Sequence, residues 1–265
     1  MIEIGISSAS FFLKAQTEDT FDIFRSMGCE ICEIFLNTFS EYEDSFTEML
    51  AARRGDVRVH SVHSLNNHYE PELFNQSDRT RGDAEAILRK VLRGGERLGA
   101  KYYTFHGQAR LKSKPYNVNS QKLGERCKAI NAICNEYGIN LSYENVHWAL
   151  YNYSTFFREM QEYAPDISAT LDIKQAMQSG ISCYDYLEDM GTSLSTVHAC
   201  DYHENGKLCI PGEGCFDFVG LFEKLLNNGY DKPVLLELYS GDYKDFDDVK
   251  RGYEYLKDCL AIASR

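Results

Sequence analysis

Four short segments in the second half of the chain end an apolar run with a residue that can bind a metal ion. They are Leu141-Ser142-Tyr143-Glu144, Ala169-Thr170-Leu171-Asp172, Ser195-Thr196-Val197-His198 and Val234-Leu235-Leu236-Glu237. A carboxylate at the end of a buried strand is costly unless it is paired or ligates an ion. Three carboxylates and one imidazole suit a divalent ion such as Mn²⁺, Mg²⁺, Co²⁺ or Zn²⁺. We therefore expect these four ends to converge on one divalent metal ion.

Further polar residues end apolar runs earlier in the chain. His63 and His106 each close such a run, and Glu33 closes another and could also point inward. On the open side of the metal, the two histidines would orient substrate oxygens, although histidines whose hydrogen bonds are satisfied inside the core would give the same pattern. His60 falls on the strand face opposite to His63, so we predict that it is a packing residue,.

The elements that must position these residues alternate between strands and helices. Expected strands are Ile2–Ser8, Ile31–Leu36, Val57–Ser64, Tyr102–Gly107, Ile139–Val146, Ile167–Ile173, Leu194–Tyr202 and Val234–Tyr239. Helical periodicity marks Ala84–Leu98, Gln121–Tyr137 and Val219–Asn227,. Eight such units in 265 residues predict a single (β/α)8 TIM barrel over residues 1–265,. The main alternative is a doubly wound sheet, but no Gly-x-Gly-x-x-Gly follows the first strand,.

Strand parity predicts which side chains face the interior. Glu144 shares a face with Ser142, and Asp172 shares a face with Thr170, because side chains two apart point the same way,. The opposite faces are apolar and would pack on helices. An antiparallel sheet with one wet face would show the same alternation, but the intervening helices favour a barrel.

Composition limits the class of function. Lys and Arg number 28 and Asp and Glu number 40, giving a formal net charge of −12 that disfavours nucleic-acid binding and favours a small substrate,. The chain contains no run of roughly 18 apolar residues that would predict a membrane span,. Its N-terminal residues do not resemble a signal peptide. The nine cysteines are an odd number, so we expect free thiols in the cytoplasm,. Cys29 and Cys32 have a CxxC spacing, but they begin an apolar strand-like run and no second CxxC follows, so we expect neither a redox nor a zinc role,.

Several short motifs, in order along the chain, carry a resemblance to a known family. They are Tyr143-Glu144-Asn145, Leu171-Asp172-Ile173-Lys174-Gln175-Ala176, Val197-His198-Ala199-Cys200-Asp201, Pro211-Gly212-Glu213-Gly214 and Leu236-Glu237. Together they resemble the xylose isomerase-like TIM-barrel superfamily, which contains sugar phosphate isomerases and epimerases, and also endonuclease IV. Within it, the ketose 3-epimerases are the group that this chain looks like.

The resemblance implies an activity and a set of site residues. The metal would be held by Glu144, Asp172, His198 and Glu237, with manganese among the candidate ions. Glu144 and Glu237 would also be the catalytic acid and base, interconverting a ketose or related polyol carbonyl compound through a cis-enediolate. The same resemblance suggests a homodimer or homotetramer. Substrate contacts are expected from His63, His106, Gln175, Lys174 and Asp201.

Departures from the family pattern narrow the activity. Many members carry a histidine where this chain has Gln175, and endonuclease IV carries zinc ligands where this chain has Gly206 and Leu208. These differences disfavour a trinuclear phosphodiesterase. Lys174 could reach a substrate anion or be a solvated or structural lysine. Asp201 could orient a ligand or cap its loop.

Two other functions are compatible with the same residues. An inosose dehydratase-like lyase would use the same metal to remove water from an enolised cyclic ketone. A barrel that has lost catalysis would bind sugars or a partner as a sensor, although a decayed site need not keep all four ligand types.

Overall fold

Eight parallel strands close into a barrel in the computed structural model, which describes residues 1–65, 68–110 and 118–265. The strands are β1 (Ile4–Ser7), β2 (Ile31–Leu36), β3 (Arg58–Ser64), β4 (Tyr102–Phe105), β5 (Asn140–Glu144), β6 (Ser168–Asp172), β7 (Leu194–Ala199) and β10 (Val234–Leu236). Their order around the barrel is β1-β10-β7-β6-β5-β4-β3-β2, and every neighbouring pair is parallel. The fold is the predicted (β/α)8 TIM barrel.

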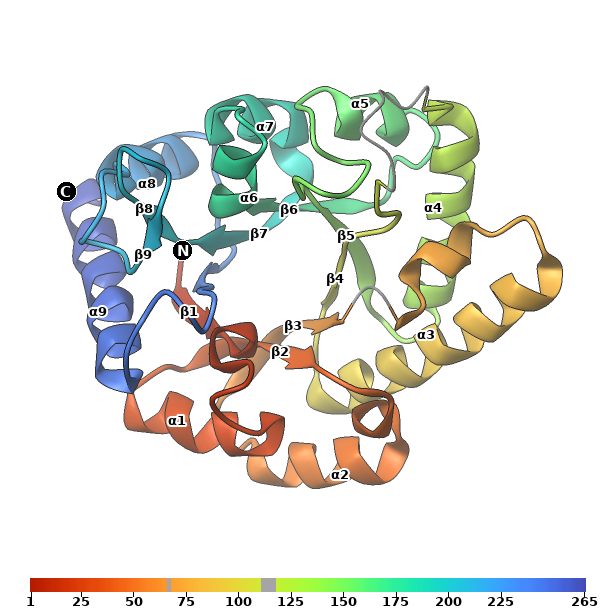
Figure 1. Ribbon diagram of the computed structural model, residues 1–265, viewed down its shortest axis with the longest axis horizontal. Helices are drawn as coiled ribbons and strands as arrows, with labels where there is room; N and C mark the ends of the chain where they lie inside the picture. The colour runs from red at the N-terminus through yellow and green to blue at the C-terminus, as the bar shows by residue number, and fades with distance from the viewer. Residues whose placement is uncertain (66–67, 111–117) are drawn as a thin grey trace.

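Helices surround the barrel as an outer ring (Figure 1). The α-helices are α1 (Thr20–Ser26), α2 (Asp44–Arg53), α3 (Asp78–Leu98), α4 (Ser120–Asn135), α5 (Phe156–Gln161), α6 (Ile173–Gln178), α7 (Cys183–Met190), α8 (Phe218–Asn227) and α9 (Phe246–Ala263). Short 3-10 turns are η1 (Ser8–Phe11), η2 (Thr17–Asp19), η3 (Phe39–Tyr42), η5 (Glu70–Phe74) and η6 (Gly191–Ser193). Within the described ranges, no helix has the length and apolar character to cross a membrane.

Buried apolar side chains of the strands fill the layer between barrel and helices, as strand parity predicts. Leu141 and Tyr143 of β5 are fully buried members of this core, whereas Ser142 between them faces the barrel interior. The Ser142 hydroxyl lies 2.6 Å from Thr170 Oγ1 on β6 and 2.7 Å from Ser195 Oγ on β7. A hydrogen bond from β5 to β7 passes over β6, and side chains of these strands converge in this way only on the inner side of a barrel. The strand face that carries the hydroxyl groups therefore points into the barrel.

Two strand irregularities change which side chains reach the interior. The pairing of β2 with β3 passes from Cys32↔Val59 to Glu33↔Ser61, which leaves His60 as an extra residue. Its Nε2 atom lies 2.9 Å from Thr196 Oγ1 and 3.1 Å from the Ser195 carbonyl, on β7 across the barrel. The predicted placement of His60 on the strand face opposite to His63 is therefore wrong, because a bulge breaks the alternation on which it depended,.

The strand predicted over Leu194–Tyr202 is shorter than expected. β7 ends at Ala199, and β8 (Asp201–Tyr202) leaves the barrel to pair antiparallel with β9 (Leu208–Cys209). The Asp201 carboxylate explains the break, since it accepts hydrogen bonds from the backbone N–H groups of Gly212, Gly214 and Phe216. The chain turns away from the barrel to satisfy that buried charge.

Candidate functional site

The four predicted ligands, Glu144, Asp172, His198 and Glu237, lie together at the C-terminal end of the barrel, and we call them the quartet. Glu144 and Asp172 end β5 and β6, His198 lies near the end of β7, and Glu237 follows β10, all of them buried. His198 Nδ1 is 3.1 Å from Glu144 Oε1, 3.2 Å from Glu237 Oε2 and 3.9 Å from Asp172 Oδ2. One ligand atom from each residue lies within 4.8 Å of the other three, as donors around a shared cation would. Glu237 Oε2 has no hydrogen-bond partner among the described residues although it is buried, so this donor set fits a metal ion.

Glu33 lies against the His198 ring on the side away from the other proposed ligands. It is fully buried on β2, where it accepts hydrogen bonds from the hydroxyls of Ser7, Ser61 and Thr104 at 2.6–2.9 Å. Its Oε1 atom lies 3.2 Å from His198 Nε2, on the ring edge away from the other ligands. A carboxylate behind a histidine is the usual support for a metal-binding imidazole. Burial would raise the pKa of Glu33, but the two neighbouring histidines, His198 and His63, hold this pKa well below its ordinary value.

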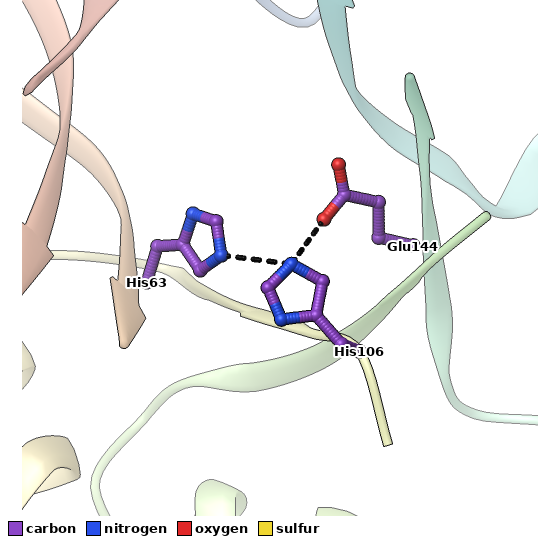
Figure 2. A group of neighbouring side chains, drawn as sticks. All are labelled: His63, His106 and Glu144. Atoms are coloured by element: carbon purple, nitrogen blue, oxygen red, sulfur yellow. Dashed lines mark hydrogen bonds and ion pairs between the residues drawn. The ribbon is translucent and has the colours of Figure 1, made fainter. Parts of the chain in front are cut away.

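His63 and His106 meet Glu144 on the other side of the quartet (Figure 2). His106 Nε2 lies 3.0 Å from His63 Nε2 and 2.9 Å from Glu144 Oε2. Burial would lower the pKa of His106, but its contact with Glu144 raises this pKa overall. The Trp148 ring lies 5.5 Å from the His106 ring. The structure thus brings both predicted histidines to the site, where His106 Nε2 contacts Glu144 and His63 Nε2 contacts His106.

Glu70 is a buried site carboxylate that sequence reasoning missed. It lies in η5, where it accepts hydrogen bonds from the backbone N–H groups of His106 and Gly107 at 3.0 and 3.1 Å and from the Tyr103 hydroxyl. Its Oε2 atom is 3.8 Å from His106 Nδ1. Glu70 therefore holds the end of β4 and faces the rear of the His106 ring. No strand pattern surrounds it, so nothing in the sequence distinguished it from a surface acid.

Lys174 lies behind two of the predicted metal ligands. The side chain is 1% exposed, and Nζ contacts Asp172 Oδ2 and lies 2.9 Å from Glu237 Oε1. Burial would lower the pKa of Lys174, but Asp172 and Glu237 hold it well above its ordinary value, so the side chain is an ammonium ion. The alternative of a solvated lysine is thereby excluded.

Gln175 and Asp201 have different surroundings. Gln175 Nε2 donates to the Tyr239 hydroxyl at 3.1 Å, and its Oε1 atom lies 2.6 Å from His147 Nδ1 beside the quartet. Asp201 instead binds the backbone of the Pro211–Gly214 loop, and a Cβ atom at Gly214 would lie 2.2 Å from Asp201 Oδ1. Of its two predicted roles, the contacts of Asp201 correspond to loop capping.

Sequence comparison agrees with this architecture. Residues 21–259 match the family described as xylose isomerase-like TIM barrel. The chain belongs to this family. Among curated relatives, L-ribulose-5-phosphate 3-epimerase UlaE of Escherichia coli O1:K1 / APEC is 24% identical over 222 residues, covering 78% of this chain and 74% of the relative.

Solved structures share the fold over nearly the whole chain. A D-tagatose 3-epimerase-like protein superposes with a TM-score of 0.81 at 20% identity, covering 99% of this chain and 98% of the other. An L-ribulose 3-epimerase gives 0.81 at 16% identity, covering 100% and 96%. The IOLI protein with a zinc atom gives 0.79 at 14% identity, covering 99% and 98%. Epimerases, which are isomerase-class enzymes, recur among these relatives.

Proposed function

We propose that this protein is a divalent-metal-dependent sugar epimerase or isomerase. The observation that supports this most is the convergence of Glu144, Asp172, His198 and Glu237 at the C-terminal end of the barrel. The curated relatives include L-ribulose-5-phosphate 3-epimerases, so the proposed substrate is a ketose or a related polyol carbonyl compound. Mn²⁺, Mg²⁺, Co²⁺ and Zn²⁺ all suit this donor set. The free state of all nine cysteines supports a cytoplasmic location,.

Glu144 and Glu237 are the proposed acid and base. A divalent ion held by the four ligands would polarise the substrate carbonyl and make the adjacent C–H acidic. Glu144 ends β5 and Glu237 follows β10, with β6 and β7 between these strands, so the two carboxylates approach from different sides. One glutamate removes the proton to give a cis-enediolate, and the other returns a proton to the opposite face, which inverts the carbon. Return to the neighbouring carbon gives aldose–ketose isomerisation.

His63, His106 and Gln175 are the proposed substrate-binding residues. The two Nε2 atoms beside Glu144 can hydrogen-bond to sugar oxygens, and Gln175 can donate and accept such bonds,. We do not assign Lys174 and Asp201 to the substrate, because their charged atoms already contact Asp172 and Glu237 or the Pro211–Gly214 loop.

Deuterium exchange tests the proposed reaction. Purified protein loaded with Mn²⁺ is incubated in D₂O with a panel of ketoses and inososes, and the substrates are examined by NMR. The expected result is deuterium on the carbon next to the carbonyl of at least one ketose, with formation of its epimer or aldose isomer. Loss of water from an inosose would instead identify the lyase. Bound metal without exchange on any member of the panel would contradict the proposed epimerase.

Elemental analysis tests the site independently. One divalent ion per chain is expected, and this ion should be lost when Asp172 is replaced by Asn. Two ions would place the second at His63, His106 and Glu144, whose ligand atoms also lie within 4.8 Å of one another. Protein that binds no divalent ion would overturn the proposed function.

A further inference from the structure

Lys174 places a fixed positive charge inside the proposed metal site. It belongs to the first turn of α6, two residues after Asp172, and its side chain is 1% exposed. The ammonium contacts one carboxylate from β6 and one that follows β10, namely Asp172 and Glu237. The Tyr239 ring lies 5.1 Å from Nζ and helps to cover it. A flexible side chain is thus held between two ligands.

The four proposed ligands and Lys174 together carry a net negative charge. Glu144, Asp172 and Glu237 contribute three negative charges, and Lys174 contributes one positive charge, so the sum is −2. His198 adds none as a neutral ligand, with its Nε2 atom facing Glu33,. Glu33, buried 3.2 Å behind His198 Nε2, adds a further negative charge, so the site stays negative and the ammonium offsets part of that charge. The ammonium lies against two of the proposed ligands, so it repels a cation bound there, and it repels a trivalent ion more than a divalent one,.

We propose that Lys174 sets the charge selectivity of the site, because its ammonium weakens the binding of a trivalent cation more than that of a divalent cation. The same ammonium holds Asp172 and Glu237 together when no metal is bound. This inference depends on the proposed metal-binding function and adds to it the choice of ion. Lys174 is a positioning residue in this scheme, since it acts through the ligands and not on the substrate.

The test compares a divalent and a trivalent ion. Wild type and Lys174→Met, which keeps the length of the side chain and removes its charge, are stripped of metal and titrated with Mn²⁺ and with Tb³⁺. Each unit of ionic charge is repelled by the ammonium, so its removal should benefit Tb³⁺ more than Mn²⁺. We expect the ratio of the two dissociation constants to shift toward Tb³⁺ by about tenfold or more.

Matched variants separate charge from structure. Lys14→Met removes a positive charge whose described contacts are the carbonyls of Tyr243 and Lys244 and the Tyr243 ring, away from the four proposed ligands, so its ratio should equal that of wild type. Lys174→Arg keeps the charge and should also keep the wild-type ratio. Should Lys174→Met fail to fold, Lys174→Gln provides the neutral variant, because its amide can still donate a hydrogen bond.

Thermal unfolding supplies the second readout. Without metal, Lys174→Met should melt at a lower temperature than wild type, and Mn²⁺ should remove most of that difference. An unchanged Mn²⁺/Tb³⁺ ratio in the neutral variant would overturn the role of Lys174 while leaving the metal site intact. Wild-type protein that binds neither ion would instead overturn the metal site, and this inference with it.

Discussion

The barrel interior holds two polar layers that differ in charge. The lower layer, further from the C-terminal end of the strands, is neutral. In it the Ser142 hydroxyl bonds to the hydroxyls of Thr170 and Ser195, and His60 bonds to Thr196 from the opposite side of the barrel. The upper layer is a set of buried carboxylates around His198. The lower layer satisfies its own hydrogen bonds, whereas Glu237 Oε2 in the upper layer has no hydrogen-bond partner among the described residues. Stability is thus expected to depend on the lower layer and activity on the upper one.

The largest effect is expected from Glu237→Gln in the upper layer. The amide cannot act as a base and is a poorer metal ligand, so deuterium exchange into the substrate should fall by about 10³-fold or more. Glu41→Gln is the control, because Glu41 is also a buried carboxylate but binds Thr17 and the Asn37 backbone, away from the quartet. Equal losses in the two variants would refute the assignment.

Glu33→Gln should weaken metal binding, because it removes the charge that supports the His198 ligand. The neutral amide supports His198 less well than a carboxylate, so the affinity for Mn²⁺ should fall by about 10–100-fold. The measurement is a competition titration with a metal-binding dye. Glu70→Gln changes another fully buried carboxylate, which lies behind His106 rather than His198, and should leave this affinity unchanged. A decrease of the same size in both variants would show that burial, and not contact with His198, is responsible.

The stability of the protein should depend on pH through His60 in the neutral layer. Burial lowers the pKa of His60 from 6.5 to about 4. As the pH falls below 6.5, His60 becomes protonated in the unfolded chain, whereas in the folded chain it stays neutral until about pH 4. The stability that is present above pH 6.5 is therefore lost over this range,. Between pH 7 and pH 5 this loss amounts to about 2 kcal/mol.

Urea unfolding of His60→Gln at both pH values tests that expectation. The variant lacks the titrating group, so its stability should fall by about 2 kcal/mol less than that of wild type over the same interval. An identical pH dependence in the two proteins would mean that folding does not shift the pKa of His60.

The smallest effect is expected from Ser142→Ala. Removal of one buried hydroxyl leaves Thr170 and Ser195 with one hydrogen bond fewer and should cost about 1–2 kcal/mol of unfolding free energy,. Affinity for Mn²⁺ should not change, because this layer does not contact the ion. Ser264→Ala, at an exposed hydroxyl, should be within about 0.5 kcal/mol of wild type,. A loss of metal affinity in Ser142→Ala would show that the layers are coupled.

The barrel and the upper layer could be predicted from the sequence because each strand carries its own signal. β2 was predicted at its observed bounds, Ile31–Leu36, and β5 and β6 differ from prediction only at their ends. Glu144 and Asp172 followed from the same patterns, since an acid closing an apolar run is rare without a partner. Local alternation and strand order were sufficient for these features.

The remaining features depend on contacts that the sequence does not encode locally. His60 was misplaced because the bulge in β3 is set by pairing with β2. Glu70 was missed because it reaches the site from a 3-10 turn that follows no alternation. The direction of Lys174 stayed open because it depends on Glu237, which lies 63 residues further along the chain.

The reduced cysteines have a practical consequence. Eight of the nine are buried, and Cys215 is the exposed one. Its backbone N–H donates to the Tyr202 carbonyl, immediately beyond the Pro211–Gly214 loop that Asp201 binds. A thiol-reactive fluorophore should therefore attach at this single position without further mutagenesis. Its emission would report, in real time, whether the loop moves when a sugar enters the barrel.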